Sequence, residues 1–132
     1  MKLLVDTNIF LEVLLEQARA TEAKEFLAKA DVHDFFISDF SLHSIGLILL
    51  RRYRSAAFRQ FLADMVIGAG STVALLHADE IDAVIDYAAT FNLDFDDAYQ
   101  YAVAEKYDLM IISFDKDFDG TTRGRREPAA IA

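Results

Sequence analysis

Four short apolar runs recur along the chain, and at least one helix-like stretch separates each run from the next. The runs lie at residues 2–5, 35–38, 72–76 and 109–113. Each is too short for a stable helix and has the continuous apolar character of a strand buried on both faces. Strands that alternate with helices form a parallel sheet with right-handed crossovers, and their C-terminal ends meet at one edge. The chain is therefore predicted to adopt an α/β fold around a central parallel sheet.

The stretches between these runs carry apolar residues at helical spacing and begin with capping residues. Thr7 or Asn8 is expected to cap the first helix, and Ser38 or Asp39 is expected to cap the helix after the second strand. The expected helices span residues 9–15, 21–30, 40–53, 55–68 and 78–91, followed by one that begins near residue 96. A length of 132 residues with one proline and five glycines predicts a single ordered domain, residues 1–132.

Composition excludes several classes of protein. The sequence contains no cysteine, so neither a disulfide framework nor a thiolate zinc site can form. The N-terminal apolar run stops at Asp6 and is too short for the core of a signal peptide. A cytoplasmic location without membrane association is therefore expected.

The net charge of −9 is distributed unevenly along the chain. Residues 60–105 hold nine of the 22 acids and no Lys or Arg, so the acidic excess is local. Arginines gather outside this window, and they are candidates for contacts with the phosphates of RNA. The first cluster is Arg51, Arg52, Arg54 and Arg59, and the second is Arg123, Arg125 and Arg126. All of these except Arg59 are expected to contact RNA. Solvated helix faces and tails are the alternative explanation for such runs.

Acidic side chains follow the predicted strands or begin the last helix. Asp6 follows the first strand, Asp39 the second and Asp115 the last, while Asp97 lies at the start of the last helix. Carboxylates gathered at one edge repel each other unless a proton or a cation neutralises them. Mg²⁺ or Mn²⁺ is the expected cation, because both prefer oxygen ligands and activate water for phosphodiester cleavage. Taken singly, the same residues are equally explained as helix caps or turn residues.

Three segments, in this order, resemble the PIN domain family, and especially the VapC-type toxin ribonucleases. The segments are LLVDTNIFLEVL, ISDFSLHSIGLIL and DFDDAYQYAVAEKYDLMIISFDKDFDGTTRGR. The resemblance implies a three-layer α/β/α sandwich with a central parallel sheet of four to five strands. It also implies a ribonuclease that uses Mg²⁺ or Mn²⁺, forms homodimers and is bound by an antitoxin protein as the toxin of a type II toxin–antitoxin system.

The resemblance also assigns roles to individual residues. The family's metal-binding acids match Asp6, Asp97 and Asp115 in this sequence. Asp6 and Asp97 are expected to hold the metal, and Asp115 is expected to orient the attacking water or a second ion. The supporting positions are Asn8, Ser113 and Asp117.

One position departs from the family pattern. The family usually carries a glutamate early in the helix after the second strand, and this sequence has Ser44 there. Asp39 lies ~140° around the helix from Ser44 and His43 lies ~100° away, so neither replaces the acid well. Weak nuclease activity is therefore expected, and the alternative is a PIN module that acts by binding an antitoxin-like partner or RNA. A phosphorelay receiver domain ranks last, because it requires an acidic pair after the first strand and only Asp6 is there.

Overall fold

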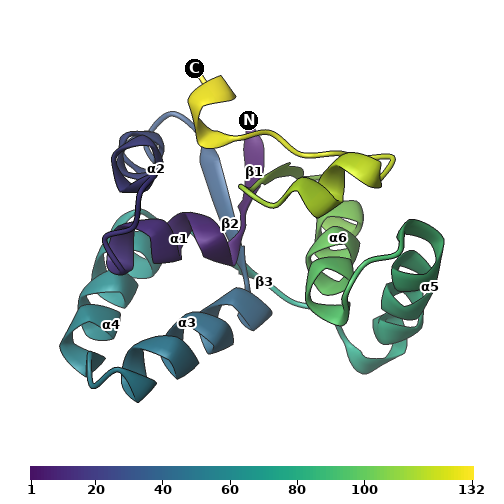
Figure 1. The fold of residues 1–132 in the computed structure, drawn as a ribbon, viewed down its shortest axis with the longest axis horizontal. Helices are drawn as coiled ribbons and strands as arrows, with labels where there is room; N and C mark the ends of the chain where they lie inside the picture. Colours follow the sequence, from purple (N-terminus) through teal and green to yellow (C-terminus); the bar gives the residue numbers. More distant parts are fainter.

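The computed structural model describes residues 1–132 and contains a four-stranded parallel sheet with helices on both faces (Figure 1). The strands are β1 (Lys2–Val5), β2 (Asp34–Ser38), β3 (Thr72–Ala74) and β4 (Met110–Ile112). The helices are α1 (Thr7–Leu14), α2 (Ala20–Leu27), α3 (Asp39–Arg51), α4 (Ser55–Phe61), α5 (Ile81–Phe91) and α6 (Phe95–Tyr107). None of these helices has the length and apolar character needed to cross a membrane. The predicted α/β class, parallel sheet and layered arrangement are confirmed.

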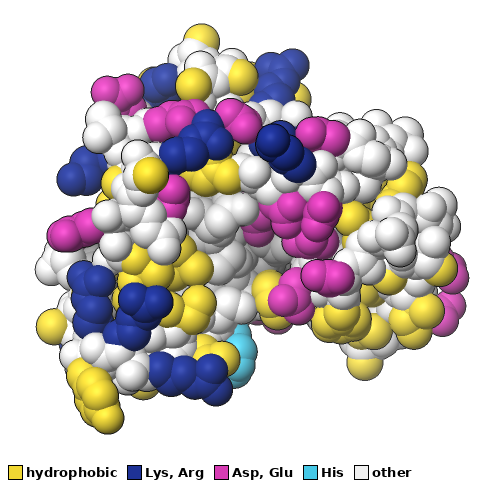
Figure 2. Space-filling model, viewed as in Figure 1, with side chains coloured by type: hydrophobic (Ala, Val, Ile, Leu, Met, Phe, Trp, Pro, Cys, Tyr) yellow, Lys and Arg dark blue, Asp and Glu magenta, His cyan; other side chains and the backbone are white.

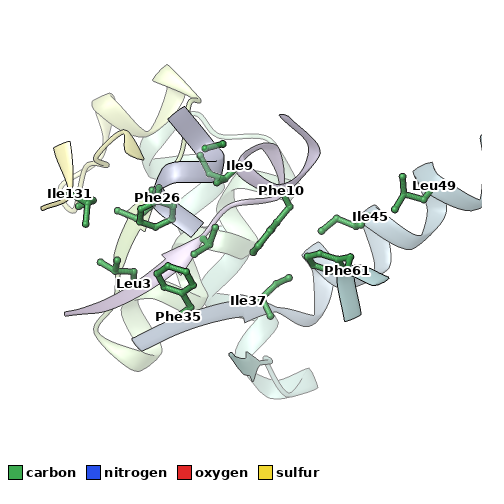
Figure 3. Close-up of a cluster of buried hydrophobic side chains, with 13 residues drawn as sticks. Leu3, Ile9, Phe10, Phe26, Phe35, Ile37, Ile45, Leu49, Phe61 and Ile131 are labelled. Atoms are coloured by element: carbon green, nitrogen blue, oxygen red, sulfur yellow. The ribbon is translucent and has the colours of Figure 1, made fainter. Parts of the chain in front are cut away.

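The two faces of the sheet bury separate hydrophobic cores. Leu3 and Val5 of β1 point to one face and pack with residues of α1, α2, α3 and α4 (Figure 3). Leu4, between them in sequence, points to the other face and packs against α5 and α6. This alternation follows from the period of two in a strand, and it explains why the runs carry polar residues only at their ends. All three β1 leucine and valine side chains are fully buried.

The first and last strands of the chain are neighbours in the sheet, whose strand order is β3-β2-β1-β4. Val5 pairs with Ile112, and the backbone N–H of Asp6 donates to the carbonyl of Ile112 at 3.0 Å. The chain leaves β1 toward β2 on one side, whereas β4 lies on the other side, so the end of β1 is a topological switch point. In open parallel sheets this point is where ligands bind.

A rudimentary fifth strand lies beyond β4. Arg126 forms an isolated parallel bridge with Ile112, and its backbone N–H donates to the carbonyl of Ile111 at 2.9 Å. Its own carbonyl accepts from the N–H of Ser113 at 3.0 Å. The C-terminal segment therefore covers the edge of β4, and this pairing protects that edge from other chains.

Helix caps also fix the polar residues at the ends of the strands. Asp6, rather than Thr7 or Asn8, is the N-cap of α1, and its side chain accepts from the Thr7 N–H. Ser38 is the N-cap of α3, and its hydroxyl accepts from the N–H of Ser41 at 3.0 Å. Both caps follow directly on a strand. Polar side chains at these positions are therefore held against the helix start, at the same edge of the sheet.

The helix expected over residues 55–68 changes character halfway along. It is α-helical to Phe61 and then forms a π-helix over Leu62–Gly68, in which the Ala69 N–H donates to the carbonyl of Asp64. A Cβ atom at Gly68 would lie 2.8 Å from the Ala63 carbonyl oxygen, so the wider turn closes only around a residue without a side chain.

The third strand is shorter than the apolar run that encodes it. β3 ends at Ala74, because the next backbone groups bond to side chains of α6 instead of to β2. The carbonyl of Leu75 accepts from Lys106 at 3.0 Å, and the N–H of Leu76 donates to the hydroxyl of Tyr99 at 3.3 Å. Apolar patterning alone does not distinguish a backbone that pairs with a neighbouring strand from one that bonds to side chains.

Candidate active site

The C-terminal ends of β1 and β4 open into a cavity of about 290 Å³ that lies between α1, α3 and α6. Figure 2 shows acidic side chains gathered in a hollow at this part of the surface, with Lys and Arg side chains set apart from it. The residues that line the cavity are Asp6, Thr7, Asn8, Leu11, Phe40, Ser44, Ile48, Asp96, Asp97, Gln100 and Asp115. Three predicted acids, Asp6, Asp97 and Asp115, therefore share one cavity.

Asp6 is the deepest acid of the site and is 7% exposed. Its Oδ1 atom accepts from the Thr7 N–H at 2.8 Å and from Gln100 Nε2 at 2.9 Å. Its Oδ2 atom accepts from the Ser113 hydroxyl at 2.6 Å and, at 3.5 Å, from Asn8 Nδ2. Burial raises the pKa of this carboxyl, and the hydrogen bonds from Ser113 and Gln100 oppose that rise.

Asp97, Asp115 and Asp117 form the closest group of acids in the chain. Each offers a carboxylate oxygen, and these oxygens lie within 4.8 Å of one another. Partial burial, followed by the negative charge of Asp115 and then that of Asp6, raises the pKa of Asp97 from 3.8 to about 7. The cluster is therefore short of positive charge, since no Lys or Arg lines the cavity.

Asp117 was expected only as a supporting position, yet its carboxylate lies in this closest group. The loop after β4 brings it there, because the Asp117 N–H donates to Oδ1 of Asp115 at 2.9 Å and starts a 3₁₀ turn over Lys116–Gly120. This geometry adds an acid to the side of the site that Asp97 and Asp115 define, whereas Asp6 lies deeper.

Asn8 and Ser113 tie the end of β1 to the end of β4. Asn8 Nδ2 donates to the Ser113 hydroxyl at 3.1 Å, and Asn8 Oδ1 accepts from the N–H of Phe114 at 3.2 Å. The Ser113 hydroxyl also accepts from the N–H of Asp115 at 2.9 Å. These bonds orient the loop that carries Asp115, which is a positioning role of the kind expected for both residues.

Ser44 lines the same cavity from α3, one and a half turns beyond the start of the helix. Asp39 does not reach the cavity, and its carboxylate instead accepts from the hydroxyl of Tyr99 at 2.8 Å. His43 lies on the exposed face of α3. Neither residue therefore supplies the acid that Ser44 lacks.

Gln100 is a site residue that the sequence did not single out. It is 2% exposed and lies one helical turn after Asp97 on α6. Its Nε2 atom donates to Ser41 at 2.9 Å as well as to Asp6, and its Oε1 atom accepts from Ser38 at 2.5 Å. The one feature of the sequence that could have identified Gln100 is that it is polar on an otherwise apolar helix face, three positions after Asp97.

The six arginines that were candidates for RNA contacts fall into two groups. Arg51, Arg52 and Arg126 are exposed, and their side chains have no partner within the chain. The other three are held internally. Arg54 donates to the carbonyl of Leu14, Arg123 pairs with Glu105 and Asp108, and Arg125 pairs with Asp119 and Glu127.

The donor set of the cavity fits a hard divalent cation. Its ionisable side chains are carboxylates, and none of the chain's three histidines lines it. Oxygen ligands of this kind suit Mg²⁺ and Mn²⁺, and the cavity lacks the His and Cys side chains that typical zinc sites use. Asp97, Asp115 and Asp117 are the residues that could hold such an ion together, with Asp6 at the base of the cavity.

The fold and the site define an α/β sandwich with an acidic, oxygen-lined centre at the switch point of its sheet. The PIN domain model matches residues 3–124, so the chain belongs to the PIN domain family. The resemblance found in the sequence is thereby confirmed. Among curated proteins, none matches this chain in sequence.

Several solved structures share the fold. VapC20 of Mycobacterium tuberculosis, described as a toxin that cleaves the sarcin–ricin loop, has a TM-score of 0.75 and 22% identity over 92% of this chain and 95% of its own. A toxin–antitoxin complex from Klebsiella pneumoniae has a TM-score of 0.71 and 18% identity, over 96% of this chain and 97% of its own. VapBC2 of Rickettsia felis, bound to a promoter DNA fragment, has a TM-score of 0.72 and 12% identity, over 96% of this chain and 98% of its own. At these identities the likeness establishes the fold, which is that of VapC toxins.

Proposed function

We propose that this protein is a metal-dependent endoribonuclease, the toxin of a toxin–antitoxin pair, and that Mg²⁺ or Mn²⁺ is its cofactor. The observation that carries the proposal is the convergence of Asp97, Asp115 and Asp117, with oxygens within 4.8 Å of one another, above the buried carboxylate of Asp6. Like charges this close repel each other unless a proton or a cation neutralises them, and burial together with the charges of Asp115 and Asp6 raises the pKa of Asp97 to about 7.

The chain's own residues divide the work of phosphodiester hydrolysis. Asp6 and Asp97 would hold the cation, and Asp115, whose carboxylate lies beside those of Asp97 and Asp117, would orient the attacking water or a second ion. Hydrogen bonds of Asn8 and Ser113 hold the loop after β4 against the end of β1. The bound metal supplies a more acidic water and neutralises charge that develops on the phosphate. No side chain in the cavity is a strong nucleophile, so hydrolysis by water requires no covalent intermediate.

The exposed arginines support RNA as the substrate class. Arg51 and Arg52 at the C-terminal end of α3, together with Arg126, are free to contact phosphates, which the acidic cavity itself repels. An antitoxin partner and a homodimer are part of the proposal. The partner is supported by the toxin–antitoxin assemblies named for the Klebsiella and Rickettsia structures.

An RNA cleavage assay tests the proposal. Wild-type protein is expected to cleave single-stranded RNA with Mn²⁺ and to stop when EDTA is added. Asp115→Asn is expected to lose on the order of 100-fold in rate, because it removes a carboxylate from the site. Asp86→Asn is the matched control, since it removes the same charge from an exposed position on α5. Equal loss in both variants contradicts the assignment of Asp115.

Ser44 favours a second candidate function, a PIN module that binds an antitoxin-like partner or RNA without cutting it. A hydroxyl attracts a divalent cation less strongly than a carboxylate does, so the site has one charged ligand fewer than is usual in the family. Wild-type protein that binds Mn²⁺ but leaves RNA intact, even at high Mn²⁺, supports this second function over the first.

A further inference from the structure

Gln100 joins three elements beneath the acidic cavity. Its side chain extends from α6 and contacts Asp6 at the end of β1 and two serines at the start of α3, Ser38 and Ser41. All four residues are buried. The amide is oriented with its NH₂ group toward Asp6 and Ser41 and with its oxygen toward the hydroxyl of Ser38.

The two oxygens of Asp6 are not equivalent in this arrangement. Oδ1 accepts two hydrogen bonds, from the Thr7 N–H at 2.8 Å and from Gln100 at 2.9 Å, which fill both of its lone pairs. Oδ2 accepts one short bond, from Ser113 at 2.6 Å, and a contact with Asn8 at the 3.5 Å limit of hydrogen bonding. The remaining capacity of the carboxylate for a cation therefore lies on Oδ2.

We propose that Gln100 is a positioning residue that restricts Asp6 to a single ligand oxygen and thereby selects small octahedral cations over Ca²⁺. Mg²⁺ demands octahedral geometry with short bonds, which one oxygen of each carboxylate satisfies. Ca²⁺ takes six to eight oxygens and commonly uses both oxygens of a carboxylate. The inference deepens the proposed function, and it rests on that function only in taking the cavity as a divalent-cation site.

Removal of the Gln100 amide leaves Oδ1 with the Thr7 N–H as its one donor, so one lone pair of this oxygen becomes available to a cation. Gln100→Met keeps the length of the side chain and removes both of its hydrogen-bonding groups. Partners that orient a metal ligand typically contribute 10–100-fold to affinity, so Mn²⁺ is expected to bind about 10-fold more weakly. Ca²⁺ gains a second ligand oxygen and is expected to lose little, so the ratio of the Ca²⁺ and Mn²⁺ dissociation constants narrows by about 10-fold.

Titration calorimetry with Mn²⁺ and with Ca²⁺ measures this ratio without reference to RNA cleavage. Val84→Ala is the matched control, because it creates a cavity under α5, far from Asp6, and lowers stability without altering the site. Its ratio is expected to equal that of wild type. Gln100→Asn is a second variant, whose amide is one methylene too short to reach Asp6. If Gln100→Met does not fold, the ratio of dissociation constants measured for Gln100→Asn tests the inference.

The outcomes separate this inference from the proposed function. A narrower ratio in the Gln100 variants, with an unchanged ratio in Val84→Ala, supports the inference even if wild-type protein cleaves no RNA and the nuclease proposal fails. An unchanged ratio in a folded Gln100 variant overturns the inference and leaves the nuclease proposal standing. Wild-type protein that binds neither cation overturns both.

Discussion

Replacement of Asp97 by asparagine is expected to stabilise the metal-free protein at alkaline pH. The folded state raises the pKa of Asp97 from 3.8 to about 7, chiefly through burial and then through the charges of Asp115 and Asp6. A raised acid pKa means that the folded state holds its proton more tightly than the unfolded state does. The associated stability is complete below pH 3.8 and is lost as the pH rises through about 7. Above that pH the wild-type protein contains an unfavourable charge that Asp97→Asn removes.

The size of the effect follows from the pKa and the exposure of the side chain. A rise from 3.8 to about 7 sets an upper limit of about 4 kcal/mol, at roughly 1.4 kcal/mol per pH unit. Asp97 is only partly buried, so solvent screening reduces the expected gain to about 1–2 kcal/mol. At about 2.1 cal/mol/K of unfolding entropy per residue, this gain raises the Tm of a 132-residue chain by about 4–7 °C.

Thermal melting in EDTA at pH 8 and at pH 4.5 tests this reasoning. The gain is expected at pH 8 and should largely vanish at pH 4.5, where the protonated Asp97 is neutral like asparagine. Saturating Mn²⁺ should reverse the order, because the cation stabilises only a site that binds it. Asp86→Asn removes the same charge from an exposed position on α5, outside the cavity, and should not raise the Tm. An equal gain at both pH values, or no gain in EDTA, refutes the account of Asp97.

Three further substitutions test other parts of the structure. Ser44→Glu is expected to tighten Mn²⁺ binding and to speed RNA cleavage, whereas a lower Tm that Mn²⁺ does not restore would show that Ser44 is only a packing residue. Arg51→Ala with Arg52→Ala should flatten the salt dependence of RNA binding by about one to two units of log–log slope, and an unchanged slope would remove both from the interface. Arg125→Ala should cost about 1–2 kcal/mol in urea unfolding, since its side chain is 9% exposed and pairs with two acids; a loss confined to RNA affinity would contradict this structural role.

The sequence predicted the parts of the fold that depend on periodicity. Runs that are apolar at every interior position require a sheet covered on both faces, and the two hydrophobic cores, one on each face, provide that cover. The meeting of Asp6 and Asp115 followed from the same logic, because parallel strands end at one edge. Asp97 joins them through the turn before α6, which periodicity does not specify.

The sequence was less informative where partners lie far apart in the chain. Clustered arginines suggested RNA contacts, but Arg123 and Arg125 find acids contributed by α6 and by the loops that follow α6 and β4, and no local pattern encodes those pairs. Gln100 was missed for a similar reason. A single glutamine on an apolar helix face acquires meaning only when Asp6 and Ser38 are brought beside it by the sheet.

The pairing of the first strand with the last has a consequence for the synthesis of this protein. Asp6 leaves the ribosome long before β4 and Asp115, which lie much later in the sequence. The contact between their ends joins residues that lie far apart in the sequence, and such contacts form late in folding. A nascent chain that ends before Met110 has Asp6 without its neighbours on β4 and without the acids of the following loop. A growing chain of this protein therefore holds no assembled acidic site until β4 and the loop after it have been synthesised.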